Sequence, residues 1–184
     1  AGLIAEAKSR GGKLDYTSAG PGSFGHLSME MLKQQGGFDA QHIAYKGSAP
    51  AHQDILAGQV DMMFDNLGAS MQLIKGGQIK LLAVASAKRM AALPDVPTIA
   101  ETLPGFEAVA WFGVVAPPKT SMTIVNKINA DINEALHDPD VQTKLANLNA
   151  EVVGGTQEAT AAYFRAETAR WAKVIKDANV KVDQ

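Results

Sequence analysis

Residues 13–37, with the sequence KLDYTSAGPGSFGHLSMEMLKQQGG, decide the fold class of this protein. The first part, residues 14–18, is typical of a short strand because it contains aromatic and β-branched side chains. A glycine-rich turn follows at residues 20–25, and Leu27 and Met31 then lie four positions apart, as on one face of a helix over residues 23–35. A Gly-Gly pair ends this helix. The stretch predicts the first strand, turn and helix of an α/β sheet.

The same alternation continues downstream. It predicts further strands at residues 42–45, 60–64, 79–85, 107–116 and 152–153, and further helices starting at residues 48, 66, 121, 139 and 156. Single helices between strands imply right-handed crossovers, which belong to parallel sheets. We therefore expect an α/β fold with a mostly parallel sheet, helices on both of its faces, and C-terminal helices after it.

Composition excludes several classes of protein. Apolar residues make up 46% of the 184 positions, which is enough for a core, and charged residues make up 20% with a net charge of −2. That balance argues against a nucleic-acid partner, which requires a basic surface. The chain contains no Cys and no apolar stretch long enough to cross a bilayer.

Residues 1–12 have helical spacing without an N-terminal cap, so we interpret them as the end of a truncated helix.

The glycine-rich turn is the first candidate site. Residues 20–25, Gly-Pro-Gly-Ser-Phe-Gly, satisfy G-x-G-x-x-G between a strand and a helix, as in dinucleotide-binding proteins. Those proteins carry an acidic residue about twenty positions later, but this chain has Ala-Tyr-Lys-Gly at residues 44–47. Free N–H groups at a helix start still favour an anion, so an anion site is predicted. A nucleotide-binding enzyme, and a turn that merely needs glycine, remain alternatives.

Two other loops are predicted to lie beside this turn. Residues 45–48 and 64–66 each follow a strand, and the carboxyl ends of parallel strands line the ligand crevice of α/β sheets. They offer Lys46 and Asp65 as charged groups, although Asp65 and Asn66 are equally suited to cap a helix.

The four histidines lack H-E-x-x-H spacing, and no nucleophile elbow is present, so neither a metal site nor a set of catalytic residues is predicted.

Seven segments, spread in order over essentially the whole chain, share a pattern with a known family: residues 14–20 (LDYTSAG), 45–51 (YKGSAPA), 58–66 (GQVDMMFDN), 83–89 (AVASAKR), 93–98 (LPDVPT), 111–113 (WFG) and 154–156 (GGT). Together they resemble the periplasmic solute receptors of tripartite tricarboxylate transporters, the Bug proteins. This resemblance implies a type II periplasmic-binding-protein fold, in which two α/β domains close on a carboxylate-bearing solute without covalent chemistry. No enzyme activity and no cofactor are implied.

The resemblance also implies a binding site and a division of the chain. The implied ligand-binding residues are Ser18, Gly20, Pro21, Gly22, Ser23, His26, Lys46, Gly47 and Asp65. Residues 13–115 would form the second α/β domain, and residues 116–184 a helical segment that packs on a first domain missing here. We expect such a fragment to bind ligand weakly or not at all, and its uncovered apolar faces to favour a homodimer.

The implied setting is periplasmic. The receptor would capture a small carboxylate, either a dicarboxylate or an amino-acid-like solute, and deliver it to the membrane permease subunits of the transporter.

Overall fold

The computed structural model describes residues 1–181 and contains two compact units. We call the first the sheet unit; it comprises residues 1–110 and the segment from Trp171 onward. The second, the helical unit, comprises residues 111–170. The division falls between Ala110 and Trp111, inside the stretch 107–116 that the sequence predicted as a strand. The domain boundaries implied by the family resemblance stay predictions.

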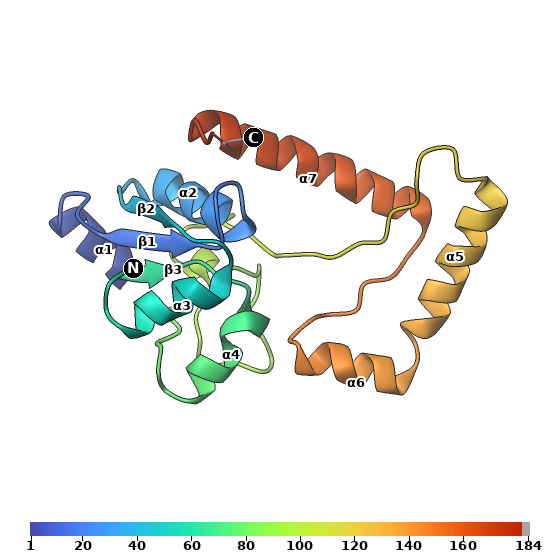
Figure 1. Ribbon diagram of the computed structural model, residues 1–184, viewed down its shortest axis with the longest axis horizontal. Coiled ribbons are helices and arrows are strands. Elements are labelled where there is room, and N and C mark those ends of the chain that lie inside the picture. The colour runs from blue at the N-terminus through green and yellow to red at the C-terminus, as the bar shows by residue number, and fades with distance from the viewer. Residues whose placement is uncertain (182–184) are drawn as a thin grey trace. The chain divides into compact units, whose positions relative to one another are not determined.

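The sheet unit contains three parallel strands, which confirms the predicted parallel sheet. They are β1 (Asp15–Ser18), β2 (Gln41–Ala44) and β3 (Met62–Met63), in the order β2-β1-β3. In the register of the sheet, Tyr16 of β1 lies beside His42 on one side and Met62 on the other. All three strands run in the same direction, so the loops that follow them emerge at one edge of the sheet (Figure 1).

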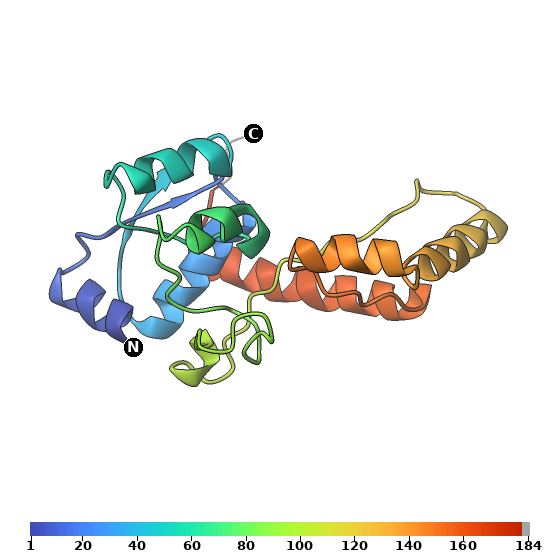
Figure 2. The same cartoon turned by 90° about the horizontal axis from the view of Figure 1, so that it is seen from below.

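Helices cover both faces of this sheet, as predicted. They are α1 (Gly2–Ser9), α2 (Phe24–Gly36), α3 (Ser48–Leu56) and α4 (Leu67–Lys75). Figure 2 shows α1 and α2 on one face and α3 on the opposite face. Ser23 caps α2 by accepting the N–H of His26, and Gly37 ends it in the left-handed conformation that glycine adopts without strain. At α3 the N-cap is Gly47, and Ser48 is the first residue of the helix.

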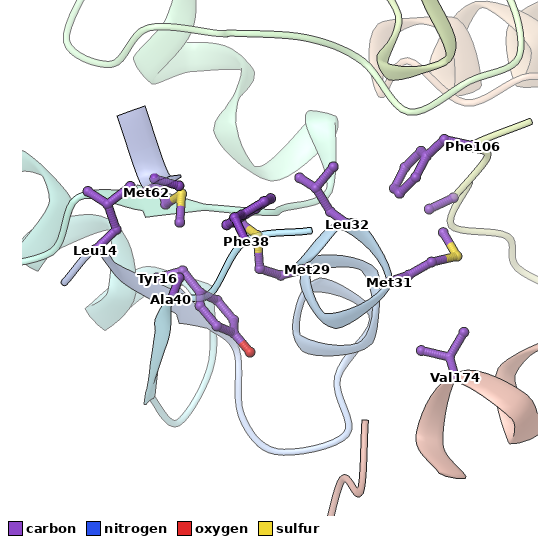
Figure 3. Close-up of a cluster of buried hydrophobic side chains, with 12 residues drawn as sticks. Leu14, Tyr16, Met29, Met31, Leu32, Phe38, Ala40, Met62, Phe106 and Val174 are labelled. Atoms are coloured by element: carbon purple, nitrogen blue, oxygen red, sulfur yellow. The ribbon is translucent and has the colours of Figure 1, made fainter. Parts of the chain in front are cut away.

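The core of the sheet unit lies between the sheet and α2 (Figure 3). Met29 and Leu32 of α2 are buried here, and each such side chain stabilises the fold by roughly 1.5–3 kcal/mol. Phe106 and Val174 close the far side of α2, so the end of the last helix contributes to this core. The cluster consists of Ala7, Leu14, Tyr16, Met29, Met31, Leu32, Phe38, Ala40, Met62, Phe106, Ala108 and Val174.

Three predicted strands are absent from the described chain. Residues 79–85 contribute only a single bridge, between Val84 and Thr98, and residues 107–116 and 152–153 form no strand. An apolar run becomes a strand only where a neighbouring backbone pairs with it over several residues. Within residues 1–181 these segments have only isolated backbone hydrogen bonds, such as that from the Ala108 N–H to the Ala85 carbonyl. Residues 111–116 are exposed instead: Phe112 is 90% exposed and Val115 is 76% exposed. In both ribbon views they run as irregular trace (Figures 1 and 2).

The helical unit contains α5 (Met122–Ala135), α6 (Pro139–Asn147) and the first part of α7 (Gln157–Asp177), which continues into the sheet unit. Asp138 caps α6, and the Thr156 hydroxyl accepts the N–H of Ala159 at the predicted start of α7. The predicted apolar stripe on α5 is half exposed, with Ile124 at 53% and Ile128 at 42%. None of the described helices combines the length and apolar character that a membrane span requires.

Candidate functional site at the start of helix α2

The turn between β1 and α2 is held by its own hydrogen bonds. The hydroxyl of Ser18, which is fully buried, donates to the carbonyl of Gly20 (3.1 Å) and accepts the N–H of the same residue (3.2 Å). Ser23 then donates its N–H to the Gly20 carbonyl (3.1 Å). Gly20 and Gly22 have φ values of +136° and +72°, which side chains other than glycine rarely adopt. These two glycines are therefore required by the shape of the turn.

The start of α2 touches the loop that follows β3. A Cβ atom added at Gly25 would lie 2.2 Å from the carbonyl oxygen of Phe64, which is far inside van der Waals contact. The absence of a side chain at Gly25 thus lets the loop at residues 64–66 approach the helix start. The predicted convergence of these two loops is confirmed.

The loop after β2 joins them. Tyr45 donates its N–H to the carbonyl of Ser18 (3.2 Å), and Gly47 donates to the carbonyl of Ala19 (3.0 Å). Gly47 has a φ of +105°, which places Lys46 at the tip of the loop beside the glycine-rich turn. The Lys46 side chain is exposed and makes no ion pair within residues 1–181. An exposed cation therefore lies next to the turn.

Free backbone donors lie at the start of α2. The first four N–H groups of a helix have no acceptor within it. Those of Ser23 and His26 are satisfied locally, by Gly20 and by the Ser23 hydroxyl. The N–H groups of Phe24 and Gly25 have no hydrogen-bond acceptor in the described part of the chain. They carry the partial positive charge of the helix dipole, which favours an anion at this helix start.

Asp65 lies at the same edge but its carboxylate already has three donors. It accepts hydrogen bonds from the Ser48 hydroxyl (3.2 Å), from Nε2 of His52 (2.7 Å) and from the Ser70 hydroxyl (2.6 Å). The side chain is only 11% exposed. Asp65 thereby ties α3 to α4 behind the loop. Neighbouring Asn66 is the N-cap residue of α4 but makes no capping bond with its side chain.

Three aromatic rings stack beneath the turn. His26 of α2 lies on His42 of β2 with ring centroids 3.9 Å apart, and His42 lies on Tyr16 of β1 at 4.8 Å. The Tyr16 hydroxyl donates to the carboxylate of Glu30 (2.5 Å), which also accepts from Lys33 (2.8 Å). Burial, and then the hydrogen bond to Glu30, raises the pKa of Tyr16. This layer is polar but lies inside the fold.

The surroundings of both histidines disfavour their charged forms. Burial lowers the pKa of His42 to about 4, and the adjacent His26 adds to the shift. Burial also lowers the pKa of His26. His26 uses its Nδ1 atom to accept the N–H of Gly22 (3.0 Å), and Nε2 of His42 contacts the Ser18 hydroxyl (2.7 Å). No group of three or more potential metal ligands occurs among the residues that the structure describes.

Comparison with known proteins decides the family. A model described as "Tripartite tricarboxylate transporter family receptor", TctC, matches residues 1–180. The chain belongs to this family. The receptor chain is also 40% identical over 184 residues to the UPF0065 protein in the tcbD-tcbE intergenic region of Pseudomonas sp. strain P51. That alignment covers 99% of this chain and 55% of the relative.

Solved structures agree in fold. The structure of R. palustris Rpa4515 with adipate is 40% identical with a TM-score of 0.88, over 97% of this chain and 60% of that chain. The periplasmic binding protein BugD is 36% identical with a TM-score of 0.84, over 97% of this chain and 61% of that chain. The receptor chain thus spans little more than half of these relatives. The α/β periplasmic-binding-protein fold and the resemblance to Bug proteins are confirmed, and the family consists of solute-binding proteins, not enzymes.

Proposed function

We propose that this chain is part of an extracytoplasmic receptor that captures a small carboxylate for a secondary tripartite transporter. The solute would be a dicarboxylate or an amino-acid-like carboxylate, and the setting the periplasm. Membership of the receptor family supports the proposal, as does the adipate in the 40% identical Rpa4515 structure. Delivery to the membrane permease subunits belongs to the same proposal.

The observation that carries the proposal is the free donor pair at the start of α2. Two adjacent N–H groups, those of Phe24 and Gly25, can hold one carboxylate without any buried cation. The Ser23 hydroxyl lies at the N-cap beside them, and Lys46 can approach from the next loop. The proposed site comprises Ser18, Gly20, Pro21, Gly22, Ser23, His26, Lys46, Gly47 and Asp65.

Within this set the residues would contribute differently. Ser23 and Lys46 would contact the carboxylate, since both can still donate to an outside acceptor. Ser18, Gly20, Gly22 and Gly47 would shape the turn through the hydrogen bonds described above. Asp65 would form the wall through its contacts with α3 and α4. The site therefore recognises negative charge mainly with backbone dipoles.

The receptor's oligomeric state belongs to the proposal as well. Ile124, Ile128 and Met122 of α5 expose apolar side chains. A second copy of the chain could cover such a face and form a homodimer. Size-exclusion chromatography with light scattering tests this directly: a concentration-dependent dimer supports it, and a monomer at all concentrations contradicts it.

The nucleotide-binding alternative receives no support from the comparisons, which show a receptor family. It predicts affinity for NAD or ATP, whereas the receptor proposal predicts affinity for adipate and similar dicarboxylates. We would measure both affinities by isothermal titration calorimetry on the natural polypeptide that carries this sequence.

Lys46→Gln should weaken dicarboxylate binding by about two- to fivefold, since an exposed ion pair contributes up to roughly 1 kcal/mol. Lys80→Gln, which removes an exposed lysine elsewhere, is the matched control. Nucleotide binding without dicarboxylate binding would refute the proposal.

A further inference from the structure

The two stacked histidines hold the glycine-rich turn from below. The N–H of Gly22 donates to Nδ1 of His26 at 3.0 Å. An imidazole nitrogen can accept a hydrogen bond only when it carries no proton, so this contact requires a neutral His26 ring with its proton on Nε2. Protonation of Nδ1 would make this atom a donor, so that it would face the N–H donor of Gly22. The position of the Gly22 peptide therefore depends on the charge of His26.

His42 acts on the other end of the same turn. Its Nε2 atom lies 2.7 Å from the Ser18 hydroxyl, and that hydroxyl also contacts both the N–H and the carbonyl of Gly20. With neutral His42, the Ser18 proton is free to point either to Gly20 or to the ring. A proton on His42 Nε2 fixes that atom as a donor. The turn is thus connected to one histidine at Gly20 and to the other at Gly22.

The two rings cannot both become charged in this arrangement. Their centroids are 3.9 Å apart with an interplanar angle of 16°, and both rings are largely buried. Two cations at that distance in a partly dehydrated site repel each other strongly. A first proton therefore disfavours the stack, and a second disfavours it much more.

We propose that His26 and His42 are positioning residues that fix the carboxylate-binding turn only while both rings are neutral, so that proton uptake weakens ligand binding. The proposal rests on the function proposed above, and it adds a regulation of that same site. The affected donors are the N–H groups of Phe24 and Gly25, which lie two and three positions after Gly22 in the chain. If the Gly22 peptide turns away from His26, these groups lose their alignment with the ligand.

The groups that face the histidines set the direction of the pH dependence. Glu30 and Lys33 of α2 and Tyr16 of β1 surround the pair. Glu30 favours the charged form, but its carboxylate already accepts from both Tyr16 and Lys33. Burial dominates and lowers the pKa of each histidine below the ordinary value of 6.5. The turn is therefore ordered at neutral pH and released on acidification.

The test separates the histidine contact from ligand binding. In ¹⁵N-labelled protein, the hydrogen bond between Gly22 and His26 should give a measurable coupling between the two nitrogens at about pH 7.5, which disappears as His26 titrates. A Gly22 amide signal that does not respond while His26 gains its proton would overturn the proposal. This readout needs no ligand, so it remains decisive even if no carboxylate binds and the proposed function fails.

Affinity for adipate provides the second readout. His26→Asn retains an oxygen acceptor for Gly22 but cannot titrate, whereas His26→Leu lacks the acceptor. At about pH 7.5 the Leu variant should bind at least about tenfold more weakly than the Asn variant, because only Asn keeps an acceptor for the Gly22 N–H. At about pH 5 the unchanged protein should fall about tenfold below the Asn variant. Comparison at equal pH cancels the titration of adipate itself. A ratio between the two that does not change with pH would overturn the proposal.

Discussion

Replacing Gly25 with alanine tests how the candidate site is assembled. The added Cβ would lie 2.2 Å from the Phe64 carbonyl oxygen, whereas an ordinary contact is at least 3.4 Å, so one of the two segments must move by about 1 Å. The obstacle is backbone, which cannot rotate away as a flexible side chain could. Overpacking of this kind costs about 1–3 kcal/mol.

The assay for Gly25→Ala is urea unfolding together with a thermal scan. The expected loss corresponds to a fall in Tm of about 2–12 °C for a chain of this size. Gly2→Ala, also in a helix, is the matched control because nothing lies within 4 Å of the added atom; its effect should stay within about 0.5 kcal/mol. A movement of about 1 Å also breaks hydrogen bonds from the start of α2, so adipate affinity should fall at least tenfold. Unchanged stability and affinity in Gly25→Ala would refute the reasoning.

Three further predictions concern the polar groups of the sheet unit. Asp65→Asn weakens a carboxylate with three donors and should lower the free energy of unfolding by about 1–3 kcal/mol in urea, while retained full stability would contradict the network. Hydrogen bonds from Arg89 and Thr98 hold the pKa of Glu101 at about 2. The ionised Glu101 carboxylate therefore stabilises the fold fully above its ordinary pKa of 4.5, and this stabilisation is lost as the pH falls toward 2. Glu101→Gln should remove that pH dependence from acid unfolding curves. The pKa of His42 is lowered to about 4, so the unfolded chain binds a proton at this residue before the folded one does, and stability falls as the pH falls from 6.5 to 4. His42→Gln should reduce the slope of the free energy of unfolding against pH over this range. An equal slope in both proteins would refute the assignment.

The first strand, turn and helix were predictable because their signals are local. The glycines at residues 20–25 specify backbone conformations that few other residues adopt, and Ser23 caps the helix that immediately follows. Parallel pairing of β1 and β2 then follows from the intervening helix. Such features depend on neighbours within a few positions, which a sequence displays directly.

The strands expected at residues 79–85 and 107–116 failed for the opposite reason. Their apolar composition indicates a buried strand, but a strand also needs a partner backbone along its length. Within residues 1–181 these segments have only a single bridge and isolated hydrogen bonds. Side-chain networks were missed on similar grounds. His52 and Ser70 reach Asp65 only because α3 and α4 lie close together there, and no spacing in the sequence predicts that contact.

The histidine stack is an intermediate case. The family resemblance implies His26 as a ligand-binding residue, whereas its partner His42 matches no metal-ligand spacing and is not predicted as a site residue. Strand pairing places His42 directly beside Tyr16, so the stack becomes predictable once the register is known. Register, more than residue type, was the missing information.

The central claim is that a carboxylate binds to the free N–H groups at the start of α2. The most direct measurement is an adipate titration of the ¹⁵N-labelled natural polypeptide that carries this sequence, followed by its amide spectrum. The account predicts saturable downfield shifts of the Phe24 and Gly25 amide protons, larger than those of any amide in α5 or α6. Saturable binding that leaves these two amides unchanged would contradict it.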